Sequence, residues 1–324
     1  MNNKPWATAA LLLAPLLSPG AAAQAGSASG AALFGEHCAE CHIGTVSKAP
    51  PLSLLQIMSP GSVWRAMDSG IMRNQAKALS PEQRLRVAEF LTGRPVEQTA
   101  AVAAAPICDE RRAAFDFDAQ PDARGWGVTL DNRRFFDRDT AGLSAADLPR
   151  LELKWAFAFP DATRARSQPA TAGGALFVGS QNGTVFALDQ ETGCIRWQFQ
   201  TVAEVRTGIV VAPWRGSEAN PLLYFGDLVG NVYAVDAVTG ELAWRDRPDE
   251  HPSLTITAAP ALHEGRLYVA LSSLEVTAAA DPEYACCTFR GGVAVYDAVS
   301  GEKLWTAYTI DKPPAVVGKN ALGT

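Results

Sequence analysis

A short pattern recurs three times in the second half of this chain and sets the strongest limit on its fold. The pattern is Asp-x-x-Thr/Ser-Gly-x-x-x-Trp, and its copies begin at Asp189, Asp236 and Asp297. Each copy follows an alternating apolar stretch typical of a β-strand, at residues 175–178, 222–225 and 266–270. The repetition predicts a series of similar β-units rather than one mixed core.

The tryptophans of these copies are spaced like the blades of a β-propeller. Trp197, Trp244 and Trp305 end the three copies, and Trp155 precedes them at a similar distance. Repeats of about 40 to 50 residues with four strands each are typical of propeller blades. A single blade cannot bury both of its faces, so we expect each Trp to pack against a neighbouring blade. In this prediction, the Asp and the Thr/Ser-Gly pair form the hairpin turn that presents the Trp.

A different motif lies near the N-terminus, where Cys38-Ala39-Glu40-Cys41-His42 has the C-x-x-C-H pattern of c-type haem attachment. In such sites the two thiols join the haem vinyl groups, and the adjacent imidazole ligates the iron. The alternative is a redox or zinc-binding cysteine pair with an incidental His42. We predict a covalent haem c at Cys38 and Cys41, with His42 as the proximal iron ligand.

Residues 26–95 around this motif are expected to form a small all-α domain. The segment Ser80-Pro81-Glu82-Gln83 has the residues of a helix N-terminus. Methionine is a common second axial ligand of haem iron, and Met72 lies in a loop-like stretch just before this helix. We therefore predict Met72 as the second ligand. Met58 and Met67 are the other candidates, and Met67 lies on an amphipathic stretch that also suits core packing.

The first 25 residues are typical of an export signal. Lys4 precedes an apolar run at residues 7–17, and Ala23-Gln24-Ala25 forms a small-x-small cleavage site. The run is too short to span a bilayer comfortably, and no later stretch resembles a transmembrane helix. We therefore expect a periplasmic protein that is exported through this signal peptide and has no membrane span.

Composition and length add limits on domain number and partners. A chain of 324 residues holds about two domains. An Ala-rich stretch at residues 96–107 is expected to be a linker between the helical domain and the repeats of residues 108–324. The net charge of −6 argues against a nucleic acid partner.

The repeated pattern resembles the tryptophan-docking motif of pyrroloquinoline quinone (PQQ) dehydrogenases. The cytochrome c domain before the repeats, together with the segment Cys286-Cys287-Thr288-Phe289-Arg290-Gly291, is similar to cytochrome-bearing polyvinyl-alcohol dehydrogenases. The resemblance covers residues 125–324 and implies an all-β, eight-bladed propeller after the all-α domain. It implies PQQ-dependent oxidation of an alcohol, polyvinyl alcohol or another secondary alcohol. The electrons would pass through the chain's own haem to a respiratory acceptor.

The resemblance also implies a set of cofactor contacts. Arg206, in Val205-Arg206-Thr207-Gly208, lies where related enzymes carry an Arg-Gly that meets the PQQ carboxylates. Thr257 resembles a cofactor-contacting Thr, and Ser272 lies in a segment that ends in a carboxylate ligand for Ca²⁺. That carboxylate is Glu275 here, and a hard oxygen ligand for Ca²⁺ would explain a charge at the end of an apolar strand.

Four cysteines remain after the haem pair, and an even number in the periplasm suggests two bridges. The resemblance implies that the neighbours Cys286 and Cys287 form a disulfide that lies over PQQ. Cys108 and Cys194 are the two that remain, and we expect them to pair.

The chain departs from the quinoprotein pattern at three places. Residues 276–289 intervene where relatives continue almost at once from Glu to Arg-Gly. Ala203-Glu204 occupies the place before Arg206 where many relatives carry their cysteine pair. Arg166 stands where alcohol dehydrogenases tend to have an acidic residue three positions before Pro.

The length of the chain bears on whether it acts as an enzyme or as a non-catalytic protein. Eight blades need far more than residues 108–324, so we expect an incomplete propeller and a catalytic base beyond Thr324. A chain of 324 residues alone is then expected to show little quinone-dependent alcohol oxidation. The alternatives to the enzyme are a truncated, non-catalytic c-type electron carrier and a propeller that serves as a binding scaffold.

Overall fold

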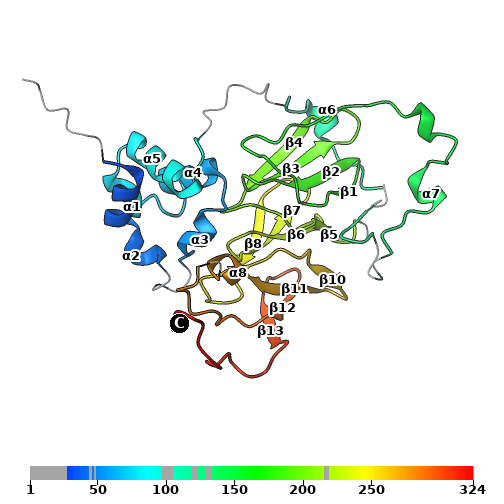
Figure 1. The fold of residues 1–324 in the computed structure, drawn as a ribbon. Coiled ribbons are helices and arrows are strands. Elements are labelled where there is room, and N and C mark those ends of the chain that lie inside the picture. The colour runs from blue at the N-terminus through cyan, green and yellow to red at the C-terminus, as the bar shows by residue number, and fades with distance from the viewer. Residues whose placement is uncertain are drawn as a thin grey trace, which may run out of the picture.

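The computed structural model contains a helical unit followed by three β-sheets (Figure 1). It describes residues 28–43, 46, 49–96, 105–118, 123–128, 131, 133–214, 219–279 and 281–323. The expected export signal and most of the expected linker, residues 97–104, lie outside this set. Within it, no helix is long and apolar enough to cross a membrane.

The described part of residues 28–96 is helical, as the sequence predicts. Its elements are α1 (Gly30–His37), α2 (Ala39–His42), α3 (Leu52–Leu55), α4 (Pro60–Asp68), the 3₁₀ helix η1 (Gln75–Ala78) and α5 (Pro81–Thr92). Ser80 and Gln83 form a capping box at the start of α5, and Gly93 ends the helix in the left-handed conformation. The apolar faces of these helices meet in one core that includes Leu33 and Leu54.

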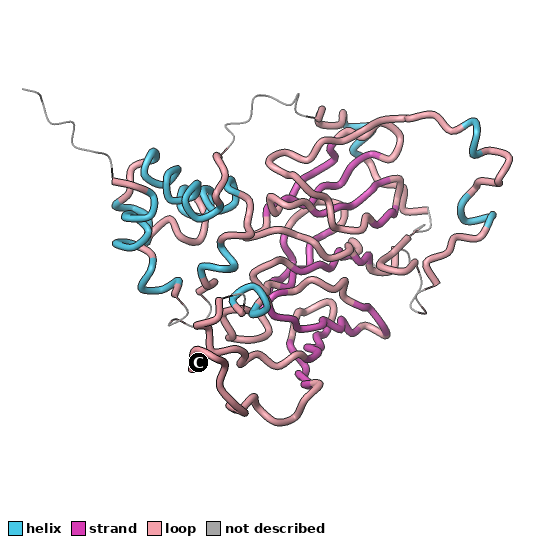
Figure 2. The backbone as a smooth tube through the Cα atoms, viewed as in Figure 1, coloured by secondary structure: helices cyan, strands magenta, loops and turns pink. Residues whose placement is uncertain are grey.

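Three antiparallel sheets follow, each with four strands in sequence order and the third with one additional strand, and the predicted repeat is confirmed. Blade 1 contains β1 (Ala170–Ala172), β2 (Ala175–Gly179), β3 (Thr184–Asp189) and β4 (Ile195–Gln200). Blade 2 contains β5 (Val210–Val211), β6 (Leu222–Gly226), β7 (Val232–Asp236) and β8 (Leu242–Asp246). Blade 3 contains β10 (Ala261–His263), β11 (Arg266–Ser273), β12 (Gly292–Asp297) and β13 (Lys303–Tyr308), and β9 (Leu254–Thr255) pairs with the end of β11. The blades lie one after another in chain order (Figure 1), and Figure 2 shows their strands in magenta beside the cyan helices of the helical unit.

The Trp of each of the first two repeats packs against the next blade, as predicted. Nε1 of Trp197 donates to the carbonyl oxygen of Ala237 at 2.9 Å, and Trp244 makes the same contact with Ala298 at 3.0 Å. The turn needs glycine here, because a Cβ on Gly240 would lie 2.8 Å from the Trp197 ring. The structure corrects one detail of the prediction. The Asp-x-x-Thr/Ser-Gly turn receives the Trp of the preceding blade and does not present its own, because its bare glycine leaves a flat space for the indole.

Residues 105–118 attach the chain to the edge of blade 1. Ile107 forms a parallel bridge with Ile195 of β4, and Cys108 is disulfide-bonded to Cys194, which confirms the expected pair. The expected linker therefore ends as part of the blade edge and not as a free tether. The remaining short helices are α6 (Glu110–Ala113), α7 (Arg138–Ala141), the 3₁₀ helix η2 (Leu148–Arg150) and α8 (Glu275–Ala278).

The helical unit docks directly onto the blades (Figure 1). Ser59 Oγ donates to Asp161 Oδ2 at 3.0 Å, and Arg65 Nη2 donates to the carbonyl oxygen of Asn182 at 2.8 Å. The core of the helical unit also continues into three apolar residues of the blade loops, Ala203, Leu228 and Val229. The two units therefore share buried apolar surface in addition to their covalent connection.

Asp227 lies beneath this junction and is completely buried. Its carboxylate accepts hydrogen bonds from the Tyr233 hydroxyl at 2.8 Å and from the Asn231 side chain at 2.8 Å. Burial raises the pKa of Asp227 to about 6, and the hydrogen bonds to Asn231 and Tyr233 offset only part of that effect. The folded protein therefore keeps a proton on Asp227 at pH values where the unfolded chain has lost it.

We expect the free energy of unfolding to decrease as pH rises from about 4 to about 6, because the folded state binds the additional proton in this window. Across this pH window Asp227 should lower the free energy of unfolding by about 3 kcal/mol, since one pKa unit corresponds to about 1.4 kcal/mol. Asp227→Asn should remove this part of the pH dependence. Urea unfolding from pH 4 to pH 8 measures it, and identical pH profiles for the variant and the parent would contradict the prediction.

Candidate functional site

The C-x-x-C-H motif lies where α1 gives way to α2, and its geometry fits a c-type haem. Cys38 and Cys41 are both unbridged. His42 is buried, and its Nδ1 lies 2.7 Å from the carbonyl oxygen of Pro50. A ring held in this way donates its Nδ1 proton to the carbonyl and keeps Nε2 as the lone pair for a metal. Pro50, a residue that the sequence analysis did not include, therefore holds His42 in an orientation that suits its predicted role as iron ligand.

The three candidate methionines differ in burial. Met58 and Met67 are buried in the helical core, at 5 % and 6 % exposure. Met72 lies in the turn after α4, is half-buried, and packs against the edge of the same core. The burial of Met58 and Met67 favours a packing role for both, and Met72 as the axial ligand stays a prediction.

Arg206, the predicted contact of the quinone carboxylates, is held by Glu204. Its Nη2 donates to Glu204 Oε2 at 2.9 Å, and its Nε is buried and has no hydrogen-bond partner among the described residues. An unpartnered guanidinium N–H beside a loop suits an anionic ligand, so the residue fits the predicted role. Burial alone would raise the pKa of Glu204, but Arg164 and Arg206 outweigh burial and lower it, so the carboxylate stays ionised.

Two further predicted quinone contacts lie in or next to blade 3. Ser272 lies in the part of β11 that pairs with β9, and Thr257 follows β9 in a half-buried loop. A Cβ on Gly208 would lie 3.2 Å from the Cβ of Ala259, so the loop of Arg206 neighbours the loop of Thr257. Among the described residues, no hydrogen bond joins Arg206 to Thr257 or to Ser272.

Glu275, the predicted Ca²⁺ ligand, is 4 % exposed and is surrounded by hydrogen-bond donors. Its Oε1 accepts from the Thr288 backbone at 2.8 Å and from the Tyr284 hydroxyl at 3.0 Å, and its Oε2 accepts from the Phe289 backbone at 3.0 Å. Burial opposes ionisation, but these bonds and the nearby His251 lower the pKa of Glu275 overall. The carboxylate therefore fastens residues 276–289 back onto blade 3.

This arrangement does not fit Ca²⁺ coordination by Glu275, because donors occupy the oxygens that the ion would need. The described residues also contain no group of three or more His, Cys, Asp or Glu side chains placed to hold a metal ion. The inserted segment that carries Thr288 and Phe289 supplies both backbone donors. The sequence shows that this segment is inserted, but it does not show that the segment folds back onto Glu275.

The same segment carries the Cys286–Cys287 disulfide, which confirms the expected bridge between neighbours. Both cysteines are exposed. They lie directly before the residues that bond to Glu275, so the anchor of the segment also fixes the place of the disulfide. Its predicted position over PQQ stays a prediction.

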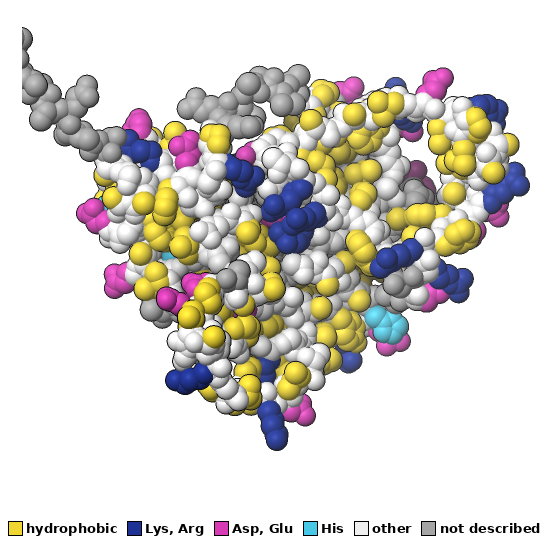
Figure 3. Space-filling view, in the orientation of Figure 1, with side chains coloured by type: hydrophobic (Ala, Val, Ile, Leu, Met, Phe, Trp, Pro, Cys, Tyr) yellow, Lys and Arg dark blue, Asp and Glu magenta, His cyan; other side chains and the backbone are white. Residues whose placement is uncertain are grey.

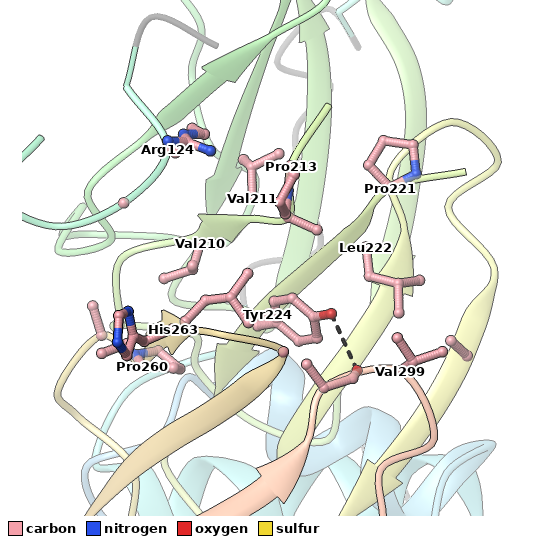
Figure 4. A pocket seen from close by; sticks show the side chains of 18 of the residues that line it. Arg124, Val210, Val211, Pro213, Pro221, Leu222, Tyr224, Pro260, His263 and Val299 are labelled. Atoms are coloured by element: carbon pink, nitrogen blue, oxygen red, sulfur yellow. Dashed lines mark hydrogen bonds between the residues drawn. The ribbon is translucent and has the colours of Figure 1, made fainter. Parts of the chain in front are cut away.

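A further cavity lies elsewhere in the described part of the chain, between blades 2 and 3. Its volume is about 1150 Å³, and apolar side chains such as Val210, Leu222 and Pro260 line it (Figure 4). Tyr224 crosses its floor and donates to the carbonyl oxygen of Ala298 at 3.1 Å. None of the predicted cofactor residues lines this cavity.

Sequence reasoning missed the role of Glu204. The residue was noted only because it stands where relatives carry a cysteine. The available signal was a single acidic residue between the apolar Ala203 and Val205, in a stretch that the structure buries. An isolated charge at such a position needs a partner of opposite charge.

The fold and the motif together define a propeller-type repeat protein that carries a helical unit with a haem-attachment sequence. Residues 109–283 and 211–322 match the PQQ_2 family, which is described as outer membrane protein assembly factor BamB. These matches span more than half of the sequence, and the chain belongs to this family.

Two curated relatives match nearly the whole chain. A polyvinylalcohol dehydrogenase of Pseudomonas sp is 33 % identical over 333 residues, which cover 98 % of this chain and 51 % of the relative. A polyvinylalcohol dehydrogenase of Sphingopyxis sp. (strain 113P3) is 30 % identical over 321 residues, which cover 94 % of this chain and 48 % of the relative. The chain thus spans about half the length of the curated relatives it matches.

Among solved structures, the quinohemoprotein alcohol dehydrogenase from Comamonas testosteroni is similar at 24 % identity. The match covers 58 % of this chain and 27 % of that structure, with a TM-score of 0.45.

Proposed function

We propose that this chain belongs to a periplasmic quinohaemoprotein alcohol dehydrogenase, which oxidises an alcohol with PQQ and passes the electrons to its own c-type haem. The observation that carries the proposal is the docking of the helical unit. Arg164 donates to the carbonyl oxygen of Ile57 at 2.9 Å and to Glu204 at 2.8 Å, and Glu204 also binds Arg206. The unit that would hold haem therefore contacts the loop that would hold the quinone.

The proposed domains are the signal peptide at 1–25, the cytochrome c domain at 26–95, the linker at 96–107 and the repeats at 108–324. In the helical domain, Cys38 and Cys41 would bind haem covalently, and His42 and Met72 would ligate its iron. The hydrogen bond from His42 to Pro50 fixes the imidazole tautomer, which keeps the ligand nitrogen unprotonated.

On the side of the blades, Arg206 would bind the quinone carboxylates, with Thr257, Ser272 and the Cys286–Cys287 disulfide as further contacts. A bound quinone supplies two-electron oxidation of the alcohol, and a haem accepts electrons one at a time. The neighbouring guanidiniums keep Glu204 ionised, and Glu204 in turn holds Arg206 in place for an anion. Because Glu275 is occupied by hydrogen-bond donors, we assign no step to Ca²⁺.

Polyvinyl alcohol or another secondary alcohol is the proposed substrate, in line with the names of the curated relatives. The proposed electron acceptor downstream of the haem belongs to the respiratory chain. None of the proposed quinone residues lines the cavity between blades 2 and 3, and the cavity has no part in this proposal.

The test is alcohol-dependent reduction of haem in the protein extended to the full length of its curated relatives and purified from the periplasm. Under anaerobic conditions, with PQQ and Ca²⁺ added, a secondary alcohol should produce the absorbance bands of ferrous haem. Omission of PQQ or of the alcohol should leave the haem oxidised. Haem that dithionite reduces but that alcohol with PQQ does not reduce would contradict the proposal and favour a simple electron carrier.

A further inference from the structure

Three guanidinium groups converge on one buried carboxylate where the helical unit meets the blades. Glu204 is 2 % exposed, and its Oε2 lies 2.8 Å from Arg164 and 2.9 Å from Arg206. Arg166 approaches Oε1 at 3.9 Å. Figure 3 shows Lys and Arg side chains gathered at this boundary. Within these four residues, positive charge exceeds negative charge by two.

The position of Glu204 is fixed by its backbone as well as by its side chain. Its carbonyl oxygen accepts the N–H of Leu228 at 2.9 Å, which joins the loop of blade 1 to blade 2. The main chain of Glu204 is therefore anchored to blade 2 by a contact that does not involve the arginines.

Arg164 extends from Glu204 in one direction, toward the helical unit. The same Nη2 atom that bonds to Glu204 donates to the carbonyl oxygen of Ile57, between α3 and α4. Arg206 extends in the other direction, with an Nε that has no partner among the described residues. One carboxylate thus holds a residue of the docking surface and a residue suited to an anion.

The two unusual positions of the sequence are complementary in this cluster. Arg166 and Glu204 stand where the quinoprotein pattern has an acidic residue and a cysteine, and here they face each other with opposite charges. Burial lowers the pKa of Arg166, and the charges of Arg206 and Arg164 lower it further. In this chain the negative charge of the cluster is therefore at position 204 and a positive charge is at position 166.

We propose that Glu204 is a positioning residue with two roles: it orients Arg206 toward an anionic ligand, and it holds Arg164 against the helical unit. The first role rests on the proposed function, with PQQ as the ligand. The second role concerns only the docking of the two units and needs no cofactor. The ion-pair cluster therefore couples the predicted quinone loop to the surface on which the haem domain sits.

The test compares Glu204→Gln and Arg164→Gln with the control Glu191→Gln, which breaks an exposed ion pair to Lys154 that measures 2.8 Å. Hydrogen–deuterium exchange of the peptide containing residues 57–62 reports docking, and quenching of tryptophan fluorescence by added PQQ reports ligand binding. Glu204→Gln should speed exchange several-fold and weaken PQQ binding about tenfold, as expected for the loss of one charge-assisted hydrogen bond. Arg164→Gln should change exchange alone, and the control should change neither.

A double variant separates positioning from a general loss of structure. If Glu204 acts through Arg206, then Glu204→Gln should weaken PQQ binding no further in a chain that already carries Arg206→Gln. Additive losses would overturn the positioning role, and unchanged exchange in Glu204→Gln would overturn the docking role. A parent protein that binds no PQQ would contradict the proposed function and the ligand role together, while the exchange experiment still decides the docking role. Circular dichroism checks that each variant is folded.

Discussion

Replacing Cys38 and Cys41 together with alanine should give a protein that contains no covalently bound haem. The thioether bonds need both thiols, and the structure leaves these two cysteines unbridged. A haem-stained denaturing gel and the pyridine haemochrome spectrum measure the loss. The matched control replaces Cys108 and Cys194, which form a disulfide with each other, and should keep the full haem content. Covalent haem in the Cys38/Cys41 variant would contradict the assignment.

The same preparation tests the iron ligands. His42→Ala should prevent a stable low-spin haem, because the imidazole that Pro50 orients is lost. Met72→Ala should change the visible spectrum and lower the reduction potential, since loss of a thioether ligand removes its stabilisation of ferrous iron. A spectrum unchanged by Met72→Ala would move the assignment to Met67 or Met58.

Trp197→Ala should destabilise the blades by about 3 kcal/mol, the lower end of the range for truncating a packed Trp. The variant loses the hydrogen bond to Ala237 and the contact of the indole with Gly240. Gly240→Ala should destabilise the same junction from the other side. Its φ of 75° disfavours a side chain, and the added Cβ meets the Trp197 ring. Urea unfolding followed by circular dichroism measures both.

Trp305 supplies the matched control for this experiment. It occupies the same position in the third repeat, but 45 % of its surface is exposed. Trp305→Ala should therefore change the free energy of unfolding by less than about 1 kcal/mol. Equal decreases in the free energy of unfolding for Trp197→Ala and Trp305→Ala would contradict a specific stabilising role for the docked Trp197.

The parts of the fold that could be predicted are those encoded within a short stretch of chain. The Asp-x-x-Thr/Ser-Gly-x-x-x-Trp copies carry their own turn, strand and docking residue, so each blade is evident from its own residues. The capping box of Ser80 and Gln83 is equally local. The Cys286–Cys287 disulfide was expected from the resemblance. Its two cysteines are adjacent in sequence and are therefore also close in space.

The missed features depend on contacts between distant segments. Arg164 and Ile57 are 107 residues apart, and nothing near either residue indicates that they meet. Glu204 was noted as a departure from a pattern, but its role depends on Arg164, which reaches it across 40 residues. The resemblance implied that Glu275 binds Ca²⁺, and its place at the end of an apolar strand agreed with that role. The path of the following loop, which returns donors to its carboxylate, decides its actual partners.

The direction of tryptophan docking sets an order of assembly for an exported chain. Each indole donates a hydrogen bond to a turn that lies later in the chain: Trp155 to Gln190, Trp197 to Ala237 and Trp244 to Ala298. An indole is therefore covered only after that later turn has folded. If the chain crosses a membrane with its N-terminus first, each blade emerges with its receiving turn ready and its own indole uncovered. Folding then advances in step with translocation, and a pause at any blade leaves one aromatic ring exposed at the growing end.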